Sequence, residues 1–196
     1  FVCDLEAIAE HFGLRKFVIL GISMGAATAI AYAMRHPERV SKLIIHGGYA
    51  LGRNKRATAK ERETAEAYRT LLRHGWGDEH SAYLKALSAI FYPRASSEEV
   101  QHFAELQRVA TSAENAIKLR SACDDIDVVQ ELSRVSAPTL VMHSRHDKFV
   151  PYEEGRRIAS SIPGARLVTL ETENHMPLPG EPAWDEFVRQ VLAFAS

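Results

Sequence analysis

The stretch FVILGISMGAATAIAYAMRHPERVSKLIIH, residues 17–46, decides the fold of this chain. It opens with a short apolar run, 17–20, which lacks alternation and therefore suits a strand buried on both faces, as in parallel sheets. The alanine-rich segment 26–34 predicts a closely packed helix, which His36-Pro37 ends because the residue before proline avoids the helical region. A second buried strand is expected at 40–46. Strand, helix and strand in this order predict parallel pairing.

The turn between the first strand and the helix, GISMG at 21–25, has the form G-x-S-x-G. In such a turn the serine sits on a sharp, strained bend, and Gly21 and Gly25 lack side chains that would clash there. The bend lifts the Ser23 hydroxyl clear of the carboxyl edge of the sheet. It also lets the helix dipole and the backbone N–H of Met24 face a developing oxyanion. We therefore interpret Ser23 as a nucleophile, the alternative being an ordinary glycine-rich turn.

Elements outside this stretch continue the alternation of strands and helices. Apolar spacing predicts one helix before the first strand and one closing helix, and Pro151 begins a further helix. Strand character returns after Pro138 and again after Gly164. The expected helices are 4–12, 151–160 and 184–192, and the expected late strands are 139–143 and 165–170.

The segment 53–134 has a different character, because it is polar, charged and helical with little strand signal. We expect three or four helices there, with capping boxes at Ser96 with Glu99 and at Thr111 with Glu114. The sequence thus predicts an α/β fold with a mostly parallel sheet built from 1–52 and 135–196. The segment 53–134 is expected to be an inserted helical cap.

Composition indicates a globular protein without a strongly charged partner. Apolar residues make up 46% of the 196 residues, and 24 basic and 25 acidic side chains leave a formal charge of -1. No stretch approaches the ~20 apolar residues of a membrane span, and early acidic residues argue against a signal peptide. Two cysteines suit free thiols in a reducing compartment. We therefore expect a cytoplasmic chain that binds neither nucleic acid nor membranes.

Residues 17–46 resemble the nucleophile strand, elbow and following strand of the α/β-hydrolase superfamily, of which the run HPERV at 36–40 is typical. The rest of the chain is similar too, with a helical cap, then an acid loop, then a histidine loop. Through GGYA at 47–50 and DIDV at 125–128, the chain also resembles hydrolase modules that bacteria join to LuxR-type regulators. The resemblance implies a serine hydrolase of the carboxylic ester type, with a small-molecule acyl substrate and no cofactor.

The same resemblance places the partners of Ser23 on two loops. A serine hydroxyl needs a base to accept its proton, and a carboxylate must hold that base in the right tautomer. The resemblance puts the base at His175, although a loop histidine can also be an exposed spectator. It puts the acid at Asp147, four residues before Pro151. We prefer this acid because loops at strand carboxyl ends converge; the rivals are Asp124, Asp125 and Asp127.

Other histidines need a separate interpretation. His143 and His146 lie near the acid loop, but no H-E-x-x-H and no pairing of cysteine with histidine supports a metal site. His46-Gly47-Gly48 resembles the glycine-rich oxyanion loop of lipases, which should however precede the nucleophile. We therefore interpret 46–48 as a plain strand exit that lines the site, and we expect no metal and no cofactor.

A complete core, as the resemblance implies, has several further strands before the nucleophile strand. The 16 residues before Phe17 cannot hold them, so we expect those strands and their second oxyanion donor to be absent. One lost donor typically costs ~10²–10³-fold in turnover. The strand at 17–20 would be an exposed apolar edge, covered by the missing segment or by a second copy in a homodimer.

Two other functions stay open at this stage. The first is a small-molecule-binding sensor module of a regulatory protein, with a slow or inactive triad. The second is cofactor-free haloperoxidase or perhydrolase chemistry on the same triad.

Overall fold

The computed structural model describes residues 1–56, 58–78 and 81–196. They form two compact units, unit 1 (Phe1–Ala50 and Asp127–Ser196) and unit 2 (Leu51–Ile126). The second boundary lies at 126 and not at the expected 134. The difference arises because the short 3-10 helix η1 (Leu132–Arg134) places Leu132, which is fully buried, in the hydrophobic core of unit 1.

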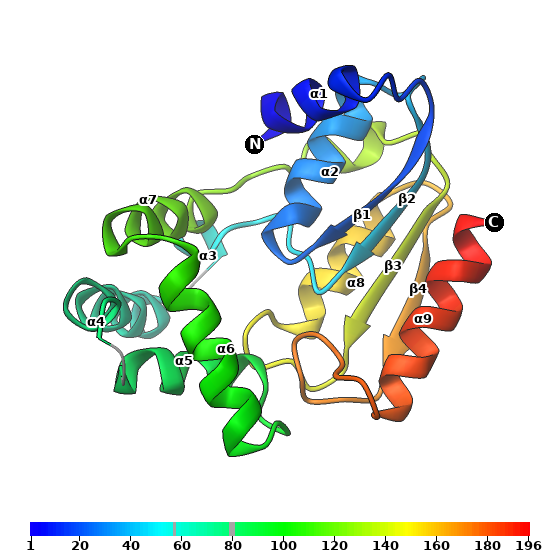
Figure 1. The fold of residues 1–196 in the computed structure, drawn as a ribbon. Helices are drawn as coiled ribbons and strands as arrows, with labels where there is room; N and C mark the ends of the chain where they lie inside the picture. Colours follow the sequence, from blue (N-terminus) through cyan, green and yellow to red (C-terminus); the bar gives the residue numbers. More distant parts are fainter. Residues whose placement is uncertain (57, 79–80) are drawn as a thin grey trace. The chain divides into compact units, whose positions relative to one another are not determined.

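Unit 1 is built on a parallel sheet with the strand order β1-β2-β3-β4 (Figure 1). This confirms the predicted α/β fold class. The register sets Ile22 of β1 beside His46 of β2, and His46 beside Met142 of β3. The strands therefore end nearly level, and the loops that follow them start at one edge of the sheet. The strands are β1 (Phe17–Ile22), β2 (Val40–His46), β3 (Thr139–Ser144) and β4 (Arg166–Leu170).

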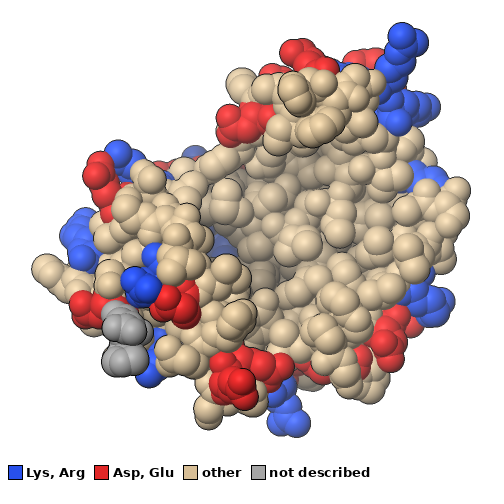
Figure 2. Space-filling model, viewed as in Figure 1, with Lys and Arg blue, Asp and Glu red and all other residues tan. Residues whose placement is uncertain are grey.

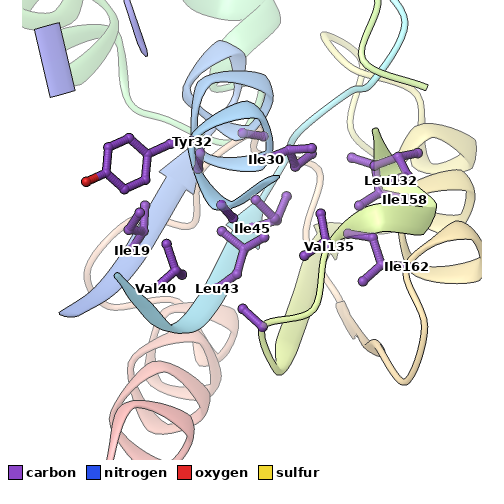
Figure 3. Packing of buried hydrophobic residues seen from close by; sticks show 14 of the residues in the cluster. Ile19, Ile30, Tyr32, Val40, Leu43, Ile45, Leu132, Val135, Ile158 and Ile162 are labelled. Carbon is purple, nitrogen blue, oxygen red and sulfur yellow. The ribbon is translucent and has the colours of Figure 1, made fainter. Parts of the chain in front are cut away.

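Both faces of this sheet are covered, which is why its strands lack polar alternation. Leu43 and Ile45 of β2 pack with helices on one face, in the cluster that Figure 3 shows around Ile30 and Ile158. Ile44 points the other way and packs with the last helix. The helices of unit 1 are α1 (Val2–His11), α2 (Met24–Arg35), α8 (Tyr152–Ser161) and α9 (Pro182–Ala195).

Strand β1 lies at the edge of the sheet, beside β2. Its side chains Leu20 and Ile22 are 40% and 38% exposed. A homodimer through this edge stays a prediction.

The described residues of unit 2 contain five helices, where three or four were expected, and no strand longer than a single bridge. Its core gathers Leu72, Trp76, Tyr83 and Leu84 with two alanines. The additional helix is the single turn α3. The helices are α3 (Arg53–Arg56), α4 (Ala59–Gly75), α5 (Ala82–Phe91), α6 (Ser97–Ala110) and α7 (Ala113–Asp124). The role of this segment as a cap stays a prediction.

Of the two predicted capping boxes in this unit, one is confirmed and one is wrong. Ser96 and Glu99 form the box that starts α6. The helix α7 is capped by Ser112, whose hydroxyl accepts the backbone N–H of Asn115 at 3.2 Å. Thr111 instead offers its carbonyl to the indole N–H of Trp76 at 2.8 Å, so the cap lies one residue later than predicted.

In the view of Figure 2, charged side chains of both signs lie near one another, mostly toward the outline of the view, and the formal charge of the chain is -1. Across the described ranges, no helix combines the length and the apolar character that crossing a membrane requires.

Candidate active site

The turn after β1 holds Ser23 in a strained backbone conformation. With φ 53° and ψ −121°, Ser23 is the one non-glycine residue with a positive φ among those described. Such a conformation costs about 1–3 kcal/mol and persists only where the surroundings impose it. Here the Ser23 N–H donates to the carbonyl of His46 at 2.9 Å, and the Ser23 carbonyl accepts the N–H of Ala26 at 3.0 Å. Met24 is the first residue of α2, so the serine stands at the helix N-terminus.

The two glycines of this turn differ in what their lack of a side chain achieves. A Cβ on Gly21 would lie 2.8 Å from the carbonyl oxygen of Gly25 and 2.9 Å from the Cα of Ala26. A Cβ on Gly25 would have none of the described atoms outside its own turn within 4 Å. The steric argument made from the sequence is therefore right for Gly21 and wrong for Gly25, whose carbonyl, and not its missing Cβ, is the point of close packing.

His175 and Asp147 are brought together by two different loops. The Nδ1 atom of His175 donates to Oδ2 of Asp147 at 2.6 Å, and the two residues are only 3% and 8% exposed. His175 is therefore no solvent-exposed spectator. The other carboxylate oxygen accepts the backbone N–H groups of Phe149 and Val150 at 2.8 and 3.0 Å. Because an ionised carboxylate only accepts, the proton lies on Nδ1, and Nε2 of the neutral ring carries the lone pair.

The electrostatics of this pair favour an ionised acid. Burial alone raises the pKa of the Asp147 carboxyl, but the hydrogen bond and charge of His175 and the Val150 N–H together lower this pKa below its ordinary value. A second ring, that of His143, has Nε2 at 3.6 Å from Oδ2 of Asp147 and donates to the Val150 carbonyl at 3.0 Å. Burial lowers the pKa of His143, so this ring is neutral beside the acid.

The rival acids all make other interactions. Asp124 faces two arginines, with Arg120 at 3.3 Å and Arg69 at 4.0 Å. Asp125 accepts the side-chain amide of Asn54 at 2.7 Å, and Asp127 accepts the N–H of the residue two positions later.

The segment 46–48 contacts both the serine turn and His175. The His46 carbonyl accepts the Ser23 N–H, and the His46 ring nitrogen Nε2 lies 2.9 Å from the carbonyl oxygen of His175. Gly47 has φ 56°, and a Cβ on it would lie 2.9 Å from Cε1 of the His175 ring. A Cβ on Gly48 would lie 2.3 Å from the Cβ of Ala26 and 3.6 Å from the Ser23 carbonyl oxygen. The serine backbone and the His175 ring thus abut the same short segment.

Glu181, the residue before α9, accepts hydrogen bonds from the loop that carries His175. Its carboxylate accepts the Thr172 hydroxyl at 2.6 Å, the side-chain amide of Asn174, and the Leu178 N–H at 2.9 Å. These donors lie on both sides of His175 in the chain. Glu181 was not among the predicted site residues, although an acidic residue just before a helix-starting proline is a recognisable signal. His46 was interpreted as part of a plain strand exit, although a polar residue that ends an apolar strand is visible in the sequence.

A buried histidine–carboxylate pair of this kind can accept a proton from a hydroxyl group. Within the part of the chain that the structure describes, no three His, Cys, Asp or Glu side chains gather as metal ligands would.

A parallel α/β unit with a strained serine between strand and helix, and with a buried histidine–aspartate pair on later loops, has the features of the α/β-hydrolase class. The sequence profile of the alpha/beta hydrolase fold matches residues 1–182. The chain therefore belongs to this family.

Relatives with named activities span the chain almost completely. The 2-hydroxy-6-oxononadienedioate/2-hydroxy-6-oxononatrienedioate hydrolase 1 of Dechloromonas aromatica is 32% identical over 97% of this chain, which spans 65% of that relative's length. RutD of Pseudomonas syringae, named as a carbamate hydrolase, is 25% identical over 98% of this chain and 73% of its own length. The chain thus spans less than two thirds of the Dechloromonas relative.

Solved structures show the same fold. The esterase EaEST from Exiguobacterium antarcticum superposes with a TM-score of 0.84 at 23% identity, covering 99% of this chain and 72% of the esterase. The meta-cleavage product hydrolase CumD from Pseudomonas fluorescens gives a TM-score of 0.74 at 20% identity, covering 98% of this chain and 69% of CumD.

Proposed function

We propose that this chain carries the catalytic triad of a serine hydrolase, with Ser23 as nucleophile, His175 as base and Asp147 as the acid that orients the base. The observation that supports this most is the buried hydrogen bond of 2.6 Å between His175 Nδ1 and Asp147 Oδ2. It occurs in the same unit as the strained serine turn. A buried histidine–carboxylate pair with a lone pair on Nε2 is what activation of a hydroxyl requires.

The proposed reaction is acyl transfer to water. The Ser23 oxygen attacks the substrate carbonyl carbon while its proton passes to Nε2 of His175, and Asp147 stabilises the imidazolium. The oxyanion faces the Met24 N–H and the N-terminus of α2. Collapse of the adduct expels the leaving group, which takes the proton from His175. Water then attacks the acyl-serine by the same route, releases the acid and restores the serine proton.

The substrate class follows from this chemistry together with the relatives. We propose a small molecule with an electrophilic carbonyl beside a leaving group, and an ester is the simplest member of that class. The relatives are named for an oxo-dienedioate and for a carbamate. A test panel should therefore contain short p-nitrophenyl esters, a p-nitrophenyl carbamate and a 2-hydroxy-6-oxo-dienedioate.

The decisive experiment is covalent labelling with a fluorophosphonate, followed by peptide mapping. We expect one label on Ser23, no label in Ser23→Ala, and undiminished labelling in Ser41→Ala, which removes a serine hydroxyl from β2 outside the site. Folded native protein that takes no label would overturn the proposal. That result would favour the alternative of a small-molecule-binding sensor module with an inactive triad.

A further inference from the structure

We propose that His46 is a positioning residue, whose ring and main chain together fix the His175 loop against the turn that carries Ser23. This inference rests on the proposed function, because it concerns the alignment of the proposed base and nucleophile. It assigns a role to a side chain that takes no part in the proton transfers.

His46 contacts both partners through different atoms. Its carbonyl accepts the Ser23 N–H at 2.9 Å, and its ring nitrogen Nε2 lies 2.9 Å from the His175 carbonyl oxygen. The next residue extends the connection, because the Gly47 N–H donates to the Met142 carbonyl of β3 at 3.0 Å. The end of β2 is therefore joined to the serine turn on one side, and to the histidine loop and β3 on the other.

The hydrogen bond defines the tautomer of His46. A carbonyl oxygen only accepts, so Nε2 must carry the proton and donate it. The Nδ1 atom is buried and has no hydrogen-bond partner among the described residues. Burial lowers the pKa of His46 to about 3, although the hydrogen bond to the His175 carbonyl opposes this shift. The ring is therefore neutral, with a fixed donor, across the neutral pH range.

The position of this histidine is difficult to explain by packing alone. His46 is fully buried at the end of a strand whose preceding residues are Leu43, Ile44 and Ile45. A buried polar ring is costly unless it is hydrogen-bonded, and an apolar residue would fill the space without that cost. The Phe187 ring packs against the His46 ring edge-to-face at 5.1 Å, which restricts rotation of the His46 ring.

Loss of the donor should loosen the histidine loop specifically. The carbonyl of His175 would lose its hydrogen bond from the His46 ring. The position of the His175 ring relative to Gly47 would then no longer be fixed. A displacement of ~1 Å can cost ~10²-fold in an enzymatic rate. A mutation with a merely structural effect would instead lower the stability and leave the His175–Asp147 hydrogen bond as it was in the folded fraction.

The test compares His46→Leu, which removes the donor, with His46→Gln, whose amide can donate from nearly the same place. Ile44→Val on the same strand serves as a packing control that leaves the site untouched. Two readouts are taken on the whole chain: the rate of fluorophosphonate labelling of Ser23, and the downfield proton NMR signal of the His175 Nδ1–H bond. We expect His46→Leu to slow labelling by about 10- to 100-fold and to shift or broaden the signal. His46→Gln should recover most of both, and Ile44→Val should change neither.

The outcomes separate this inference from the proposed function. A native chain that takes no label refutes the triad proposal, whereas the NMR signal still decides whether His46 positions the loop. An unchanged signal and rate in His46→Leu would overturn the inference. If that variant does not fold, nitrogen-15 spectra of the native histidines decide, because a His46 ring with its proton on Nδ1 also contradicts the inference.

Discussion

Acidification should destabilise this protein through His46 before it affects most carboxylates. The folded pKa of this ring is about 3, against 6.5 for an ordinary histidine, because the ring is buried. Between these two values the unfolded chain binds a proton at position 46 and the folded chain does not. The stabilisation is therefore complete above pH 6.5, and it is lost progressively as the pH falls toward 3.

The magnitude follows from the size of the pKa shift. Each pH unit within this window changes the free energy of unfolding by about 1.4 kcal/mol for a single group. From pH 8 to pH 4.5, His46 alone should remove about 2.7 kcal/mol of stability. His143 acts in the same direction, since burial lowers its pKa too, whereas the lowered pKa of Asp147 places its contribution at more acidic pH.

The assay is urea unfolding of the native chain and of His46→Gln at several pH values between 8 and 4.5. Glutamine keeps a donor but cannot titrate, so the contributions of His143 and Asp147 cancel in the difference between the two proteins. We expect the native protein to lose about 2.7 kcal/mol more than the variant over this range. Parallel stability curves for the two proteins would refute the argument that His46 stays neutral in the fold.

Three further predictions concern the serine turn, the acid and the histidine loop. Gly21→Ala should lower the free energy of unfolding by about 1–3 kcal/mol, because its Cβ would lie 2.8 Å from the Gly25 carbonyl oxygen. Gly25→Ala should leave thermal unfolding nearly unchanged, and equal losses in the two variants would contradict the steric account. Asp147→Asn should slow fluorophosphonate labelling by about 10⁴-fold because the His175 tautomer is no longer fixed, and a native rate would exclude Asp147 as the acid. Glu181→Gln removes one of two acceptor oxygens and should lower the free energy of unfolding by about 1–3 kcal/mol. Amide hydrogen exchange should become faster only in residues 172–178, and an equal increase across the whole chain would argue against a local role.

The sheet could be predicted from the sequence because its physical signal is local. All four expected strands are present and pair in parallel, and β2 was predicted with the bounds it has, Val40–His46. The expected β1 ended at residue 20 and the real strand continues to Ile22, because the serine turn begins only after the last ladder residue. The expected cap runs to 134 while the compact units divide after 126, because Leu132 lies in a polar stretch and only the fold shows that it is buried.

The sequence predicted those site residues that belong to a motif or a family resemblance. It did not predict the residues whose role depends on contacts between distant parts of the chain. Ser23, Asp147 and His175 were singled out by motif and resemblance, and the structure places the last two in hydrogen-bond contact. The ring of His46 meets a carbonyl 129 positions away in the chain, and no local pattern reports such a contact. Glu181 was recognisable as an acidic residue before a helix-starting proline. The donors that its carboxylate accepts, on Thr172, Asn174 and Leu178, are seen only in the folded structure.

The positive φ of Ser23 lowers the stability of the fold while it positions the hydroxyl for the proposed reaction. Glycine adopts such angles freely, so Ser23→Gly would release the strain of about 1–3 kcal/mol while deleting the hydroxyl. Random screens for heat resistance should therefore recover Ser23→Gly, which raises the thermal stability of the protein and abolishes its activity. In a homologue without selection for the hydrolase reaction, replacing Ser23 by glycine would increase the stability of the fold.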